Sequence, residues 1–424
     1  MDVHDVGAGR GDLIEVLDGI KQPALVIGVE SDGLFTISEQ YELAEHLHDS
    51  EMVVIQSPDG HDGFLLEFEQ INNAIISFMQ RFQHIKDILN SEGIQPPAQV
   101  GEVVKESLFG ESEIVNWWGP LMGPGRAFDP TKFFIICCNV LGSPYGTASP
   151  VTLNPETNTN YGPEFPLATI RDDVRLHKLI LDDLGVKSVA ICIGGSMGGM
   201  QVLEWSFFGQ DYIKTIVPIA TSAKHSAWCI SWGEAQRQSI YSDPNYLDGY
   251  YTSDAPPSVG LAAARMAALL TYRSRNSFES RFGRKIMDKP TYSISREPAS
   301  PAEAHHQIHN DGHLKTKGPA SRSSSVDSTG SLLAASAKAL ASTTESTDDR
   351  TEVSTAPTSG TSTPISSNPS SVSLQAIPIA LNKNKSKSQR PTVFSAQNYL
   401  RYQGDKFIHR FDANCYISIT RKMD

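Results

Sequence analysis

The feature that most constrains this chain is an apolar run that enters a glycine-rich turn and then a helix-like stretch. The run reads "ICIGGSMGGM", residues 191–200. A strand that turns through Gly-x-Ser-x-Gly into a helix is typical of a nucleophile elbow, where a strained turn exposes the serine hydroxyl. Such a turn needs very small flanking side chains, and the N-terminus of the helix can stabilise an oxyanion. The pattern predicts a nucleophilic Ser196, although glycine-rich strand–helix turns also bind phosphates.

Apolar β-branched runs alternate with amphipathic stretches along most of the chain, which predicts an α/β fold with a mostly parallel sheet and helices on both faces. The predicted strands are residues 23–30, 51–57, 133–142, 188–195 and 213–222. The predicted helices are residues 38–47, 64–83, 169–186, 198–208 and 260–278. The final segment, 393–424, predicts a helix followed by a short strand-like run.

A nucleophilic serine needs a base, and the base needs an orienting acid. Asp32, in "ESDGLF", follows the strand at 25–30, and His61, in "DGHDGF", follows the strand at 51–57. The carboxyl ends of parallel strands share one edge of a sheet, so both side chains can converge on Ser196 there. Taken singly, Asp32 is an ordinary turn residue and His61 a solvated loop histidine. Their coincidence with an elbow favours a catalytic triad.

The composition narrows the class of partner. The 424 residues carry a formal net charge of -12, which argues against nucleic acid or an anionic membrane as the main partner, while a local basic patch could bind an anionic cofactor. Five cysteines without a CxxC spacing fit a reducing compartment and predict no metal site. The polar start "MDVHDVGAGRGD" and the lack of long apolar runs predict a cytoplasmic protein without a signal peptide or membrane span.

Residues 321–370 are rich in serine and threonine and contain no aromatic residue. Such a segment buries too little apolar area to offset its ordering entropy, so residues 290–392 are predicted to be a disordered insert. The other predicted parts are core segments at 1–82 and 108–230, a connector at 83–107, a helical lid at 231–289 and a return to the lid and core at 393–424.

The order of the triad is unusual, since the elbow fold normally runs Ser, Asp, His. The chain ends with "DANCYISITRKMD" and starts with "MDVHDVGAGRG". Overlaying the two Met-Asp pairs gives a continuous sequence in which the order becomes Ser196, Asp32, His61. The sequence therefore predicts a circularly permuted chain.

Long motifs now point to a family. They include "NWWGPLMGPGRAFDP", "YGPEFPLATIRDDVRLHKLILDDLGV", "GGSMGGMQVLEW", "VPIATSAKHSAWCISWGEAQRQSIY" and "SPDGHDGFLLEFEQI". Read from 117 to 424 and then from 1 to about 82, the chain resembles the fungal homoserine O-acetyltransferases, α/β-hydrolase-fold enzymes of methionine biosynthesis. The family's strands upstream of "WWGPL" have no apolar counterpart here, so the resemblance implies that the N-terminal strands are missing.

The resemblance implies a ping-pong reaction in which Ser196 takes the acetyl group of acetyl-CoA and passes it to the hydroxyl of L-homoserine. His61 would be the base and Asp32 its orienting acid, with no bound cofactor.

The resemblance also implies the groups that bind the intermediate and the acceptor. The oxyanion would be held by the N–H of Met197 and by a donor near Leu108. Arg237 would bind the homoserine carboxylate and Asp62 its ammonium group. Without the resemblance, Arg237 is a solvated helix residue and Asp62 a turn former.

Two other interpretations of the same residues remain open. The chain is an esterase or acetylhydrolase if water replaces the alcohol, and an inactive rearranged remnant if the missing strands disable the elbow. The family further implies a homodimer with a lid supplied by residues 231–280.

Overall fold

The computed structural model describes residues 4–91, 118–287, 300–310 and 392–424. They belong to two compact units. Residues 1–291 and 394–424 form the unit that contains the sheet, and residues 292–393 form the other. Within the second unit the described helix is α13, Pro301–His309. The prediction of disorder across 290–392 is therefore wrong for this helix, whose N-cap Ser300 accepts a hydrogen bond from the Glu303 N–H.

A four-stranded parallel sheet in the order β2-β1-β6-β5 is the centre of the first unit. Its strands are β1 (Ala24–Val29), β2 (Ser50–Ile55), β5 (Cys192–Gly195) and β6 (Ile216–Ile219). Segments from the two halves of the chain pair directly, because Ala24 on β1 lies opposite both Ser50 and Ile216. All six residues of β1 are buried, as expected of a central parallel strand.

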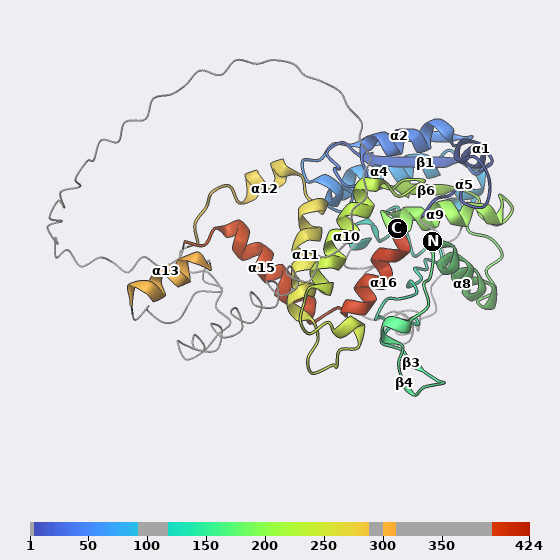
Figure 1. Cartoon of the computed structure of the whole chain (residues 1–424). Helices are drawn as coiled ribbons and strands as arrows, with labels where there is room; N and C mark the ends of the chain where they lie inside the picture. Colours follow the sequence, from blue (N-terminus) through green and yellow to red (C-terminus); the bar gives the residue numbers. More distant parts are fainter. Residues whose placement is uncertain (1–3, 92–117, 288–299, 311–391) are drawn as a thin grey trace, which may run out of the picture. The chain divides into compact units, whose positions relative to one another are not determined.

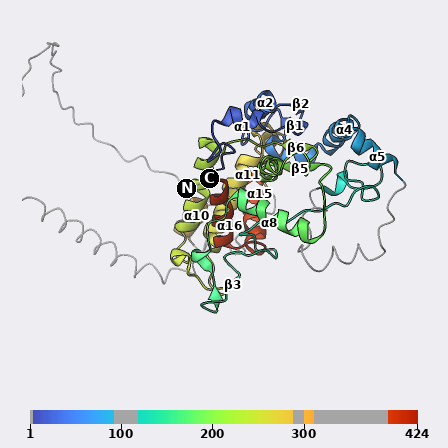
Figure 2. The same ribbon diagram turned by 90° about the vertical axis from the view of Figure 1, so that its right-hand side faces the viewer.

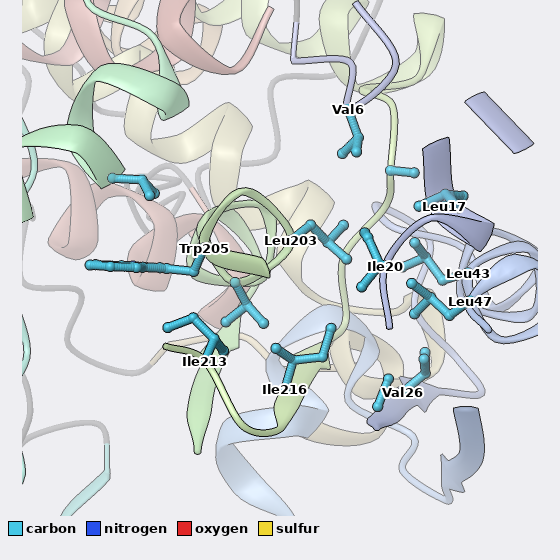
Figure 3. Packing of buried hydrophobic residues seen from close by; sticks show 14 of the residues in the cluster. Val6, Leu17, Ile20, Val26, Leu43, Leu47, Leu203, Trp205, Ile213 and Ile216 are labelled. Atoms are coloured by element: carbon cyan, nitrogen blue, oxygen red, sulfur yellow. The ribbon is translucent and has the colours of Figure 1, made fainter. Parts of the chain in front are cut away.

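The two faces of the sheet bury different helices, since side chains alternate along a strand. Ala24 and Val26 face a cluster that includes α1 (Leu13–Asp18), α2 (Ile37–His46), α8 (Ile170–Asp183) and α9 (Met197–Trp205), shown in Figure 3. Leu25, Ile27 and Val29 face the second cluster, with α4 (Phe68–Met79) and α5 (Gln83–Asn90). Helices on both faces confirm the predicted α/β layering.

Five further helices pack on one another beside the sheet (Figure 1). They are α10 (Ala227–Tyr241), α11 (Ser258–Tyr272), α12 (Arg275–Arg281), α15 (Ser395–Ile408) and α16 (Ala413–Met423). Helix α10 contacts α11 and α16, and α11 contacts α15. Ile240, Leu261, Ala264, Ala413 and Tyr416 form the buried cluster between them.

The remaining elements are short. They are η1 (Gly60–Asp62), α3 (Gly63–Leu66), η2 (Gly119–Leu121), β3 (Leu153–Asn154), β4 (Thr159–Asn160), η3 (Gly162–Glu164), η4 (Ser206–Phe208) and η5 (Leu247–Gly249). Strands β3 and β4 form an antiparallel pair that the sequence did not predict.

Residues 133–142 were predicted to be a buried strand, and the structure shows this to be wrong. They belong to no strand, and most of them are half-buried or exposed, with Phe134 67% exposed. The carbonyl of Asn139 lies 2.8 Å from His177 Nε2, and that of Val140 accepts a hydrogen bond from the Thr147 hydroxyl. A strand needs a neighbour whose backbone groups bond to its own, and here the edge strand β5 does not pair with this segment, whose Asn139 and Val140 carbonyls are bonded by side chains instead.

The strand-like run predicted near the C-terminus is also wrong, because residues 413–423 form helix α16. Asp412 caps it by accepting a hydrogen bond from the Cys415 N–H at 3.0 Å. Packing against α10 thus overrides the β-branched composition of the segment.

The two ends of the described chain lie side by side (Figures 1 and 2). The His4 N–H donates to the Met423 carbonyl at 3.3 Å, and the His225 N–H donates to the His4 carbonyl at 2.9 Å. The permuted order stays a prediction. The predicted connector 83–107 begins with helix α5, while residues 92–117 lie outside the described residues.

Candidate active site

Ser196 stands between β5 and α9 in a backbone conformation that few non-glycine residues adopt, with φ 57° and ψ -123°. Such strain costs about 1–3 kcal/mol and persists only where the surroundings enforce it. Here the Ser196 N–H donates to the Ile219 carbonyl at 2.9 Å, and the Thr221 hydroxyl donates to the Ser196 carbonyl at 2.8 Å. The end of β6 therefore holds the elbow on both sides of its serine.

The glycines around Ser196 leave no room for side chains, as the elbow pattern predicts. A Cβ on Gly194 would lie 2.2 Å from the Gly198 carbonyl oxygen, and one on Gly199 would lie 2.6 Å from Thr221. A Cβ on Gly195 would lie 2.5 Å from the Phe64 ring. The turn thus depends on a close backbone approach at Gly194 and on tightly packed side chains at Gly195 and Gly199.

Met197, one of the two predicted oxyanion donors, begins α9 and lines the cavity beside Ser196. The first N–H groups of a helix have no acceptor within it and are available to an anion. The second predicted donor, Leu108, lies outside the described residues.

Asp32 and His61 meet as a buried pair. The carboxylate Oδ2 of Asp32 lies 2.7 Å from His61 Nδ1, and both residues are 5% exposed. A carboxylate can only accept, so Nδ1 carries the proton and Nε2 is left as the basic nitrogen. The other oxygen of Asp32 accepts hydrogen bonds from the Leu34 and Phe35 N–H groups. These bonds fix the acid in an orientation that suits one imidazole tautomer.

The loops that carry the acid and the base are tied together. The Ser31 hydroxyl donates to the Ser57 carbonyl at 2.6 Å and accepts from the Gly60 N–H at 2.9 Å. Gly60 has φ 73°, and a Cβ there would lie 2.5 Å from the Ser274 nitrogen. The turn before His61 therefore requires glycine.

Phe64 joins the base loop to the elbow. Its ring packs edge-on against His61 at 5.2 Å between centroids and fills the space beside Gly195. Ser196 and His61 both lie in the described part of the chain, and no hydrogen bond joins the Ser196 hydroxyl to the His61 imidazole there. Catalytic hydrogen bonds are often long without substrate and tighten in the complex.

A cavity of about 700 Å³ opens beside the elbow, and its size is typical of small-molecule sites. Ser196 and Met197 line one side, and α16 contributes Tyr416, Thr420 and Met423. Phe35 and Tyr272 also line it, and both rings pack against His61. The rings of Phe35 and Tyr272 therefore pack against the His61 imidazole and also line the cavity.

Arg237 on α10 is buried rather than solvated, at 5% exposed. Its Nη2 pairs with the Asp424 carboxylate and donates to Glu234 at 3.2 Å, while its buried Nη1 has no hydrogen-bond partner among the described residues. Asp424 lines the cavity. A carboxylate is thus already bound where the sequence predicts that Arg237 binds one.

Asp62 is also engaged. Its Oδ2 lies 2.8 Å from Arg273 Nε, and burial raises its pKa against the opposing charge of Arg273. The predicted ammonium site is therefore occupied by a guanidinium.

His225, in the motif "KHSAW", was not predicted to be a site residue. It lines the cavity, packs against Phe35 and is 6% exposed. Burial lowers the pKa of His225 to about 4, and burial does the same for its neighbour His4. A histidine within a long matching motif was the available signal, but nothing in the sequence shows that it is buried.

Comparison with known proteins decides the family. A family model for the α/β hydrolase fold matches residues 108–307. The homoserine O-acetyltransferase of Ascobolus immersus is 55% identical over 349 residues, covering 76% of this chain and 64% of the relative. Homoserine O-acetyltransferase FUB5 of Fusarium oxysporum f. sp. lycopersici is 45% identical over 333 residues, covering 78% and 74%.

The chain belongs to the homoserine O-acetyltransferase family. This confirms the α/β-hydrolase fold expected from the elbow. The chain spans 64% and 63% of the length of its Ascobolus immersus and Emericella nidulans relatives. A crystal structure of homoserine O-acetyltransferase from Bacillus anthracis is 17% identical, with a TM-score of 0.43 over 72% of this chain and 57% of that one.

Proposed function

We propose that the chain transfers an acetyl group from acetyl-CoA to the hydroxyl of L-homoserine through an acetyl ester on Ser196. The observation that carries this proposal is the buried Asp32–His61 pair packed, through Phe64, against an elbow whose serine opens onto a cavity. Membership of the homoserine O-acetyltransferase family supports the substrates.

In the first half-reaction the Ser196 oxygen attacks the thioester carbonyl while His61 Nε2 takes the hydroxyl proton. The tetrahedral intermediate collapses, the C–S bond breaks, and the CoA sulfur leaves with the proton held by His61. Asp32 keeps the imidazole oriented and stabilises its charged form. The Met197 N–H supplies one donor for the negatively charged oxygen of the intermediate.

In the second half-reaction the homoserine hydroxyl attacks the acetyl ester and gives its proton to His61. Collapse returns that proton to the Ser196 oxygen and releases O-acetylhomoserine. The unpartnered Nη1 of Arg237 can donate to the homoserine carboxylate. Asp62 can bind the ammonium group only by giving up its contact with Arg273.

A second candidate is acetyl-CoA or acetyl-ester hydrolysis by the same triad. It is favoured by the two ion pairs that already occupy Arg237 and Asp62, because water needs neither group. The two functions differ only in the acceptor that attacks the acetyl ester.

The test measures thiol release from acetyl-CoA with and without homoserine, together with the O-acetylhomoserine formed. Transfer predicts that homoserine accelerates release and that product equals thiol; hydrolysis predicts equal release in both cases. Ser196→Ala should abolish release, while Ser239→Ala, on the exposed side of α10, should not change it. A chain with neither activity, in which a fluorophosphonate fails to label Ser196, would be an inactive remnant.

The cytoplasmic location and the homodimer remain predictions. Among the described helices, none is both long and apolar enough to cross a membrane.

A further inference from the structure

The cavity has a basic wall opposite in charge to the chain as a whole. Arg265 on α11 and the pair His409 and Arg410, at the end of α15, all line it. Among the described residues that line the cavity, the one with a carboxylate side chain is Asp424, and it is paired with Arg237. A chain of formal net charge -12 thus presents these two arginines and this histidine to the cavity.

The two arginines differ from Arg237 in how they are held, although the Asp62 carboxylate, which is paired with Arg273, also attracts Arg265. Within the described residues, neither Arg265 nor Arg410 forms an ion pair with a carboxylate. Aromatic rings hold Arg265 instead, with its guanidinium 5.0 Å from the Phe407 ring centre and 5.7 Å from that of Tyr272. Stacking on aromatic faces orients a guanidinium and leaves its N–H donors free.

The two arginines are connected through Phe407. Arg265 stacks on Phe407, and Arg410 follows Phe407 by three residues. The Phe407 and Phe411 rings flank Arg410 in sequence and stack on each other at 5.1 Å. Helix α11 packs along α15, which fixes the two donors on neighbouring elements.

We infer that Arg265 and Arg410 form an anion subsite that binds the phosphate-bearing end of the acyl donor. Guanidinium groups match phosphate oxygens with paired, charge-assisted hydrogen bonds. The same cavity contains Ser196, so a donor held at this wall can extend its thioester toward the elbow. The inference rests on the proposed function for the donor's identity, but the subsite itself is a property of the cavity.

The first test measures binding, so that it does not depend on transfer. In a Ser196→Ala background, the Kd of CoA is determined by calorimetry for the parent, Arg265→Gln, Arg410→Gln and the pair. Each single change should weaken CoA binding about 10-fold, as expected for losing a charge-assisted hydrogen bond. Arg275→Gln is the matched control, because this exposed arginine on α12 does not line the cavity.

The second test varies the ligand. Pantetheine, which lacks phosphate, should bind the Arg265→Gln protein and its parent with much closer affinities than CoA does. Dephospho-CoA, which lacks the 3′-phosphate, shows which phosphate Arg265 binds. If Arg265→Gln weakens the binding of dephospho-CoA as much as that of CoA, Arg265 binds the pyrophosphate. If it weakens the binding of dephospho-CoA less, Arg265 binds the 3′-phosphate. Binding of CoA to the parent should also weaken with added salt.

The inference is overturned if the arginine variants bind CoA as the parent does, or if they lose pantetheine affinity equally. Failure of the proposed function looks different, because the chain would then bind CoA through these arginines without acetylating homoserine. Circular dichroism of each variant separates a lost donor from a misfolded protein. Arg265→Lys, which keeps the charge but not the fork, should restore part of the affinity.

Discussion

Replacing Lys422 by Met should destabilise the protein more than any surface change of a charged residue. Its ammonium group donates to both oxygens of Asp173 at 2.8 Å and to the Leu141 carbonyl at 2.6 Å. Both side chains of the ion pair are 0% exposed. The contact attaches α16, which lines the cavity, to α8 in the core.

The size of the expected loss of stability follows from the Asp173 carboxylate, which the substitution leaves without its ion-pair partner. Removing one member of a buried pair leaves an unpaired charge, which costs about 3–5 kcal/mol. The Asp173 carboxylate would keep the Leu141 N–H and Gln201 as donors, which favours the lower half of this range. For a unit of this size the corresponding fall in Tm is roughly 6–15 °C.

The assay is thermal and urea unfolding followed by tryptophan fluorescence. Lys224→Met is the matched control, since Lys224 is 63% exposed, lies 3.6 Å from Asp5 and should cost less than about 1 kcal/mol. Adding Asp173→Asn to Lys422→Met should recover part of the loss, because the buried charge is then gone. A Lys422→Met protein as stable as the Lys224→Met protein would refute the reasoning.

Three further predictions concern the site. Gly194→Ala should prevent formation of the elbow, seen as lost labelling by a fluorophosphonate, whereas Gly198→Ala, whose Cβ meets no atom within 4 Å, should be labelled normally. Asp32→Asn should lower kcat for thiol release by a factor of the order of 10⁴ while unfolding changes little, because the amide favours the wrong tautomer; a fall under tenfold would contradict this. Lowering the pH from 7 to 5 should cost about 2 kcal/mol for each of His4 and His225, since the unfolded chain binds their protons near pH 6.5 and the folded chain only near 4. This stability is present above pH 6.5 and lost as the pH falls toward 4, so His4→Gln should flatten the urea-midpoint profile, and an unchanged profile would count against it.

Much of the sheet was predictable because two of its strands, β1 and β2, are local runs rich in apolar and β-branched residues. The apolar β-branched run at 24–29 and the run at 50–55 form strands at nearly the predicted bounds. The glycines of the elbow were predictable from the local Gly-x-Ser-x-Gly pattern, although only at Gly194 does nearby backbone exclude a side chain, while Phe64 and Thr221 fill the space at Gly195 and Gly199. Residues 133–142 failed because a strand depends on a partner elsewhere in the chain.

The candidate site divides in the same way. Asp32 and His61 could be proposed from their places after two parallel strands, and the structure joins them at 2.7 Å. The ion-pair partners of Arg237 and Asp62 could not be predicted, because Asp424 and Arg273 come from distant parts of the sequence. Ion pairs of this kind depend on how helices pack and leave no local pattern.

The sequence by itself determined the α/β class, the elbow at Ser196, the acid and base loops and the family resemblance. Each of these depends on local periodicity, turn chemistry or long continuous motifs. Only the tertiary structure decided that α16 is a helix locked to α8 by Lys422, that Arg237 is buried, and that Arg265 and Arg410 share the cavity with Ser196. The physical reason is that burial and charge pairing are set by contacts between residues far apart in the chain, which no short stretch of sequence encodes.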